Sequence, residues 1–104
     1  MPLTVHTSAG HYIFDGPHQH TNLLSDASGV YVITTRINGL HSVIDAGESA
    51  AIRSRVNSHD RQDQWAQHAG NNTLFVSALY CDERNRMIIE QQVRVTHQPP
   101  CGIR

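Results

Sequence analysis

The segment GVYVITTRINGLHSVIDA, residues 29–46, decides what kind of fold this chain can form. Its first half, 29–37, is rich in β-branched and aromatic residues, which favour a strand because they pack well on a pleated surface. Asn38-Gly39 comes next, and this dipeptide is the strongest short-range signal for a type I′ hairpin turn. The sequence therefore predicts an antiparallel hairpin in which residues 40–46 form the returning strand.

Two short helices are predicted after the hairpin. Ser49 follows the strand and is a residue type that caps helices, so we expect a helix over residues 50–58. Asp60 is expected to cap a second short helix, which Gly70 ends because glycine readily adopts the conformation that closes a helix.

One further strand and one long helix complete the predicted domain. The segment TLFVSALY, residues 73–80, predicts a strand with alternate apolar side chains on one face. Asp82 is expected to cap a helix that runs to about Thr96, and Pro99-Pro100 prevents its continuation. The fold class expected from this order is α+β, a small three-stranded antiparallel sheet flanked by helices.

The first 28 residues differ in composition from the rest of the chain. They are rich in His, Gly, Ser, Asp and Pro, and within them only Gly10–Phe14 predicts an extra short strand, followed by the turn signal Asp15-Gly16-Pro17. We therefore expect an N-terminal extension, residues 1–28, packed on a domain formed by residues 29–104.

Composition excludes some classes of function. All eight basic residues are Arg and the formal net charge is −1, so the chain lacks the overall basic excess of many nucleic-acid-binding proteins, although a local Arg cluster is compatible with these numbers. No apolar run approaches the roughly 18 residues of a membrane span, so no membrane association is expected. Cys81 and Cys101 fit free thiols in a cytoplasmic protein.

Several motifs along this predicted fold resemble those of the GIY-YIG nuclease domain, over roughly residues 29–100. Gly29-Val30-Tyr31 is similar to the first motif of that family, and Asp45-Ala46-Gly47 is similar to the second. The remaining matches are Arg55, eight residues after the second-motif glycine, His59 one helical turn later, and Ile89-Glu90 on the last predicted helix.

The resemblance implies a metal-dependent endonuclease that hydrolyses phosphodiester bonds in nucleic acid, with DNA as the expected partner. Tyr31 and His59 would move protons, and Arg55 would clamp the phosphate with paired donors. Glu90 would hold Mg²⁺ or Mn²⁺, which neutralises charge on the leaving oxygen. A homodimer or a partner protein is also expected, because a domain this small usually needs help to grip a duplex.

Three departures from the family pattern lead to a second hypothesis. Asp45 stands where the family typically has a tyrosine, and Glu48 stands where basic residues often follow. Asp45 could act as a second metal ligand or as a base. The two motifs are also about three residues further apart than usual, so the hairpin should be longer or bulged. The alternative function is therefore a catalytically degenerate domain that binds nucleic acid or a protein.

Purely structural roles are the simplest interpretation of the same residues taken singly. Tyr31 in a strand is usually a packing residue, and Trp65 is most simply part of the core. Glu90 has Arg86 and Arg94 four residues away on either side, which is the spacing of a surface ion-pair ladder on a helix.

A third and weaker hypothesis concerns the histidines of the N-terminal segment. His11, His18 and His20 could bind a transition metal, but no cysteine or further spaced ligand accompanies them.

Overall fold

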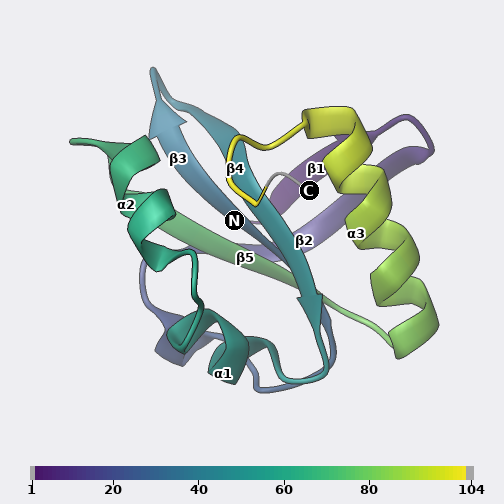
Figure 1. The fold of residues 1–104 in the computed structure, drawn as a ribbon. Helices are drawn as coiled ribbons and strands as arrows, with labels where there is room; N and C mark the ends of the chain where they lie inside the picture. Colours follow the sequence, from purple (N-terminus) through teal and green to yellow (C-terminus); the bar gives the residue numbers. More distant parts are fainter. Residues whose placement is uncertain (1, 103–104) are drawn as a thin grey trace.

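The computed structural model describes residues 2–102 of the chain, which fold around one antiparallel sheet with the strand order β1-β2-β5-β3-β4 (Figure 1). The strands are β1 (Leu3–Thr7), β2 (Gly10–His18), β3 (Gly29–Ile37), β4 (Leu40–Ser49) and β5 (Leu74–Tyr80). The helices are the short 3₁₀ turn η1 (Thr21–Leu23), α1 (Ile52–Asn57), α2 (Gln62–Ala69) and α3 (Glu83–His97). Helices α1 and α2 cover one side of the sheet, and α3 covers the other.

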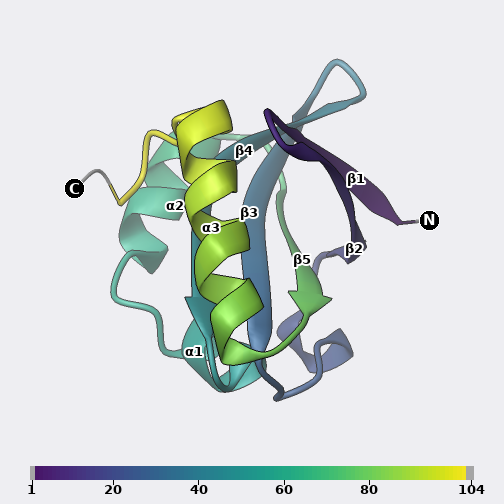
Figure 2. The same cartoon turned by 90° about the vertical axis from the view of Figure 1, so that its right-hand side faces the viewer.

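The prediction of a three-stranded sheet is wrong, because β1 and β2 extend the sheet to five strands. β2 pairs with β5, and the turn signal at Asp15-Gly16-Pro17 is accommodated inside the strand as a register shift. β1 pairs with β2, and buried Val5 and Phe14 pack with the side chains beneath α3. The β1–β2 hairpin lies against the C-terminal end of α3 (Figure 2), and these contacts are remote in sequence, so local patterns could not reveal them.

The predicted hairpin is confirmed, and it is bulged. Ile37 pairs with Leu40, and Asn38 and Gly39 have φ angles of 52° and 81°, both positive as a type I′ turn requires. The pairing shifts by one residue where Ile33 opposes Asp45 but Thr34 opposes Val43. The extra residue is Ile44, which packs in the core on the α2 side. The bulge therefore lets Asp45, the next residue, reach that same side.

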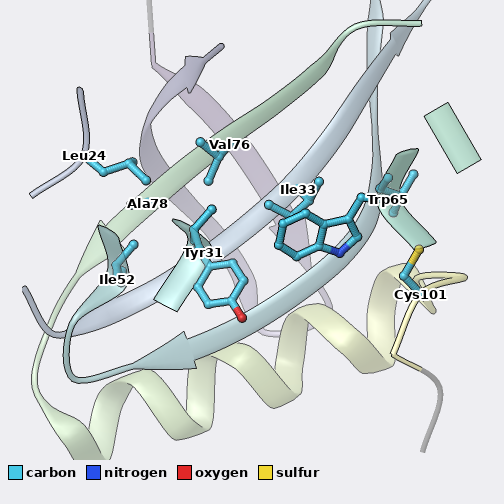
Figure 3. Close-up of a cluster of buried hydrophobic side chains, with 10 residues drawn as sticks. Leu24, Tyr31, Ile33, Ile52, Trp65, Val76, Ala78 and Cys101 are labelled. Atoms are coloured by element: carbon cyan, nitrogen blue, oxygen red, sulfur yellow. The ribbon is translucent and has the colours of Figure 1, made fainter. Parts of the chain in front are cut away.

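β3 is the central strand of the three that were predicted, and its side chains supply both cores. On the side of α1 and α2, Tyr31 and Ile33 pack with Ile52 and Trp65 (Figure 3). Facing α3, the alternate β3 residues pack with buried apolar side chains; this second core contains Val5, Phe14, Val30, Val32, Ala46, Ile89 and Val93. Because both faces of β3 are covered, its sequence is almost continuously apolar.

Two of the predicted helix caps, Ser49 for α1 and Asp60 for α2, are wrong. β4 continues to Ser49, so α1 begins later, and Asp26 from the preceding loop accepts hydrogen bonds from the backbone N–H and the hydroxyl of Ser54 at 2.8 and 2.7 Å. The N-cap of α2 is Arg61, not Asp60, and no side chain caps that helix. In contrast, Asp82 caps α3 as predicted. Within residues 2–102, no helix is long and apolar enough to cross a membrane.

Candidate functional site

Tyr31 and His59 form a buried pair at the centre of the α1–α2 side of the sheet. The hydroxyl oxygen of Tyr31 lies 2.7 Å from Nε2 of His59, although the two residues are 28 positions apart. Tyr31 is 1% exposed and His59 is 5% exposed. The Tyr31 ring lies across Gly47, its partner on β4, and its hydroxyl points towards that strand (Figure 3).

Gly47 is required by this packing. A Cβ atom at position 47 would collide with the ring and hydroxyl of Tyr31. Gly47→Ala is therefore expected to destabilise the protein by about 1–3 kcal/mol, the usual cost of overpacking a core, measured by urea denaturation. The same substitution in a Tyr31→Leu background should cost less. Equal costs in the two backgrounds would show that the tyrosine is not the obstacle.

The hydrogen bonds of His59 assign its protonation. The backbone N–H of Arg61 donates to Nδ1 of His59 at 3.0 Å, so the proton of the neutral ring lies on Nε2 and is donated to the Tyr31 oxygen. Burial lowers the pKa of His59 to about 4, and the positive charges of Arg55 and Arg61 act in the same direction. The imidazole is therefore neutral at neutral pH.

Tyr31 keeps its proton under the same conditions. Burial raises the pKa of Tyr31 to about 12, even though the neighbouring Arg55 guanidinium favours the ionised form. Because the Tyr31 oxygen accepts a hydrogen bond from His59, its own O–H is available to donate. A phosphate that reached this pair would therefore meet a hydrogen-bond donor in Tyr31.

Arg55 is the one predicted site residue that faces solvent. Its side chain is 41% exposed, whereas Tyr31, Asp45, His59 and Glu90 are all buried. The Arg55 guanidinium contacts the Asp60 carboxylate, with Nη2 and Oδ1 3.1 Å apart. The structure thus brings Arg55, Tyr31 and His59 close together.

Asp45 lies at the centre of a buried cluster of donors. Its two carboxylate oxygens accept five hydrogen bonds: from Nε and Nη2 of Arg61 at 2.8 and 3.3 Å, Nε1 of Trp65 at 2.7 Å, Nη2 of Arg94 at 2.6 Å and the backbone N–H of Ala46 at 2.8 Å. Burial acts to raise the pKa of Asp45, but the hydrogen bonds from Arg61 and Trp65 outweigh it and hold the pKa below its usual value. Its oxygens are fully used within the protein.

Glu90 lies on α3, across the sheet from Tyr31, and is 4% exposed. Its carboxylate accepts a hydrogen bond from Nε of Arg94 at 3.2 Å. Arg94 also donates to Asp45 at 2.6 Å and to the carbonyl oxygen of Ala46 on the edge strand β4. Arg94 therefore links the α3 side of the sheet to the α1–α2 side.

The predicted ion-pair ladder on α3 forms only on one side of Glu90. Arg86 instead pairs with Glu48 of β4, with Nε and Oε2 2.6 Å apart. Glu48, Glu90 and Arg94 line a surface hollow of about 630 Å³ between β4 and α3. One or two carboxylates with bound waters suit Mg²⁺, so Glu90 with Glu48 are the residues that could hold it. A cation there would compete with the two arginines.

Sequence reasoning did not single out Arg61 and Arg94 as site residues, yet they join all the others. The connected chain of contacts runs through Arg55, Tyr31, His59, Arg61, Asp45, Arg94 and Glu90. For Arg94 the four-residue spacing from Glu90 was a signal. For Arg61 the sequence carries none, because its carboxylate partner lies in a distant strand.

The described residues lack the grouped ligands of an ordinary multi-ligand metal site. Residues 2–102 contain no group of three or more His, Cys, Asp or Glu side chains placed to hold a metal ion, and the N-terminal histidines His11, His18 and His20 do not gather into one.

Comparisons of the chain with models of protein families, with curated proteins and with solved structures find no match. The resemblance to the GIY-YIG domain therefore rests on the ordered sequence motifs.

Proposed function

We propose that this chain is a GIY-YIG-like domain that acts as a divalent-metal-dependent endonuclease and hydrolyses phosphodiester bonds in nucleic acid, with DNA as the expected substrate. The observation that supports this most is the 2.7 Å contact between Tyr31 and His59 with the Arg55 guanidinium beside it. Tyr31 of β3 meets there two residues that are four positions apart in the chain, Arg55 and His59.

Each side chain in this proposal has a separate task. Arg55 would bind two oxygens of the phosphate, because a guanidinium presents paired donors in one plane. Tyr31 would donate a hydrogen bond to the phosphate through its O–H, and His59, whose Nε2–H donates to the Tyr31 oxygen, would orient the phenol. Glu90 would hold Mg²⁺ or Mn²⁺ on the α3 side of β4, across the sheet from the Tyr31–His59 pair, so a phosphate at Arg55 would have to extend around the β4 edge for the metal to neutralise charge on its leaving oxygen. Asp45 positions Arg61 and Arg94 rather than touching the substrate.

A second candidate is the degenerate domain that binds nucleic acid without cutting it. The observation in its favour is the burial of Tyr31, Asp45, His59 and Glu90, each of which has hydrogen-bond partners within the protein. Binding a phosphate at the exposed Arg55 would not require those side chains to become accessible. Hydrolysis would require an opening that admits water to the Tyr31–His59 pair.

Nicking of supercoiled plasmid and cleavage of branched DNA in Mg²⁺ test the endonuclease proposal. Arg55→Ala is expected to reduce the cleavage rate about 10²–10³-fold, the usual loss when one preorganised electrostatic donor is removed. Glu90→Gln should abolish the cleavage that depends on Mg²⁺. Arg53→Ala is the matched control, because Arg53 is an exposed arginine on the same helix and should leave the rate nearly unchanged.

The outcome also separates the two candidates. Equal cutting by the wild type, Arg55→Ala and Glu90→Gln would mean that the activity comes from a contaminant. DNA binding that is weakened by Arg55→Ala but is accompanied by no cleavage would establish the second candidate. Circular dichroism of each variant verifies that it is folded.

The proposal includes a cytoplasmic location and a further protein surface. The free thiols of Cys81 and Cys101 suit a reducing compartment. A second copy of the chain or a partner protein is expected in the complex with DNA, because one small domain buries too little surface to grip a duplex tightly. Light scattering of the DNA-bound protein measures the number of copies.

A further inference from the structure

Asp60, the ion-pair partner of Arg55, also lies close to the buried His59. Asp60 lies in the turn between α1 and α2, and its side chain is 73% exposed. Its Oδ1 atom is 3.1 Å from Nη2 of Arg55 and 3.3 Å from Nδ1 of His59. Because Nδ1 of His59 accepts the N–H of Arg61 and carries no proton, the attractive contact of this oxygen is the one with the Arg55 guanidinium.

Asp60 does not cap a helix. The N-cap of α2 is Arg61, and no side chain caps that helix, so the common structural role of an aspartate at this point in a sequence does not apply. Its own backbone N–H is the main cause of a pKa below the usual value, and the Arg55 charge adds to the effect, so Asp60 is ionised at neutral pH.

A carboxylate and a phosphate present the same features to a guanidinium. Both offer negatively charged oxygens that accept its N–H groups, and a phosphodiester can take the place of a carboxylate at the same donors. Exchange is inexpensive here, because the Arg55–Asp60 pair is exposed to water and such pairs contribute little to stability.

We propose that the Asp60 carboxylate is a built-in competitor of the substrate phosphate, so that a phosphodiester must displace it from Arg55 in order to bind. The choice of a phosphodiester as ligand rests on the proposed function, whereas the anion-binding position itself rests on the contact of the Arg55 guanidinium with the Asp60 carboxylate. Displacement would free Arg55 for the phosphate and place that phosphate next to Tyr31.

Binding of a fluorescent DNA duplex in EDTA, followed by anisotropy, tests this competition without cleavage. Asp60→Asn is expected to tighten binding about two- to fivefold, the equivalent of removing one weak ion pair. Asp63→Asn is the matched control, since it makes the same charge change at a neighbouring exposed acid at the start of α2. Its gain should be clearly smaller. In an Arg55→Ala background, Asp60→Asn should give no gain beyond that of Asp63→Asn.

Two results would overturn the competitor role: an Asp60→Asn gain no larger than that of Asp63→Asn, or a gain that persists in full without Arg55. If no variant binds DNA, the proposed function fails, and inorganic phosphate then tests the anion position alone. NMR signals of the His59 and Tyr31 side chains should saturate at a two- to fivefold lower phosphate concentration in Asp60→Asn than in the wild type, about the same factor as above. Identical midpoints would overturn the inference.

Discussion

Asp45→Asn is expected to lower the free energy of unfolding by about 3–5 kcal/mol, because it removes one partner of a buried ionic cluster and leaves the charges of the others uncompensated. Asp45 is 0% exposed, and Arg61 and Arg94 both donate to it. An asparagine would also turn an NH₂ group towards some of these donors. Urea denaturation followed by tryptophan fluorescence measures the loss, since Trp65 itself contacts Asp45.

Glu48→Gln is the matched control for this substitution. It makes the same chemical change on the same strand, and Glu48 also pairs with an arginine, Arg86, at 2.6 Å. Because the Glu48 side chain is 31% exposed, we expect a loss of no more than about 1 kcal/mol. If Asp45→Asn cost as little as this control, Asp45 would not hold the two partly buried arginines together.

The pH dependence of the Asp45 contribution has a definite sign. The pKa of Asp45 is lower in the folded protein than the value of 3.8 for the free side chain, so the unfolded chain takes up a proton first as the pH falls. The stabilisation is therefore present above that pH and is lost as the pH falls through the folded-state value. Asp45→Asn should remove this part of the acid sensitivity.

The second large effect concerns His59 and mildly acidic pH. The pKa of His59 is about 4 in the folded protein against 6.5 for the free side chain, so between these values the unfolded chain binds the extra proton. Stability should therefore fall by up to about 3 kcal/mol as the pH is lowered from 6.5 to 4. Urea denaturation at a series of pH values measures this slope.

His59→Gln is expected to flatten the slope, whatever it does to stability at pH 7, because glutamine does not titrate. Burial also lowers the pKa of His41, which contributes a residual slope of the same sign. The quantity to compare is therefore the difference in slope between the wild type and His59→Gln. His20→Gln is the control at an exposed histidine and should leave the slope unchanged. An unchanged slope in His59→Gln would mean that His59 is not held neutral by burial.

The prediction of this fold from sequence was accurate where the deciding interactions are local. The turn at Asn38-Gly39, the strand over residues 74–80 and the Asp82 cap of α3 depend on residues a few positions apart, and all three are present. The N-terminal strands were misjudged because Asp15-Gly16-Pro17 usually ends a strand, whereas here pairing with β5 carries the strand through it.

The same distinction applies to the candidate site. The ordered motifs predicted that Tyr31, Asp45, Arg55, His59 and Glu90 share one cleft. The structure brings Tyr31, Arg55 and His59 close together, whereas Glu90 lies on α3, across the sheet. The consequence of Asp45 replacing the motif tyrosine could not be foreseen, since its donors Arg61 and Arg94 lie 16 and 49 residues further along the chain. Nothing local marks an arginine as the partner of a carboxylate that far away.

By itself, then, the amino-acid sequence determined the hairpin, the strand that follows, the last helix and the order of the motif residues, because turns, caps and periodic apolar positions act over a few residues. The tertiary structure alone decided the number of strands in the sheet, the hydrogen bonds from two arginines to Asp45 and the burial of the Tyr31–His59 pair. Those features depend on packing and charge compensation between segments that meet only when the chain is folded.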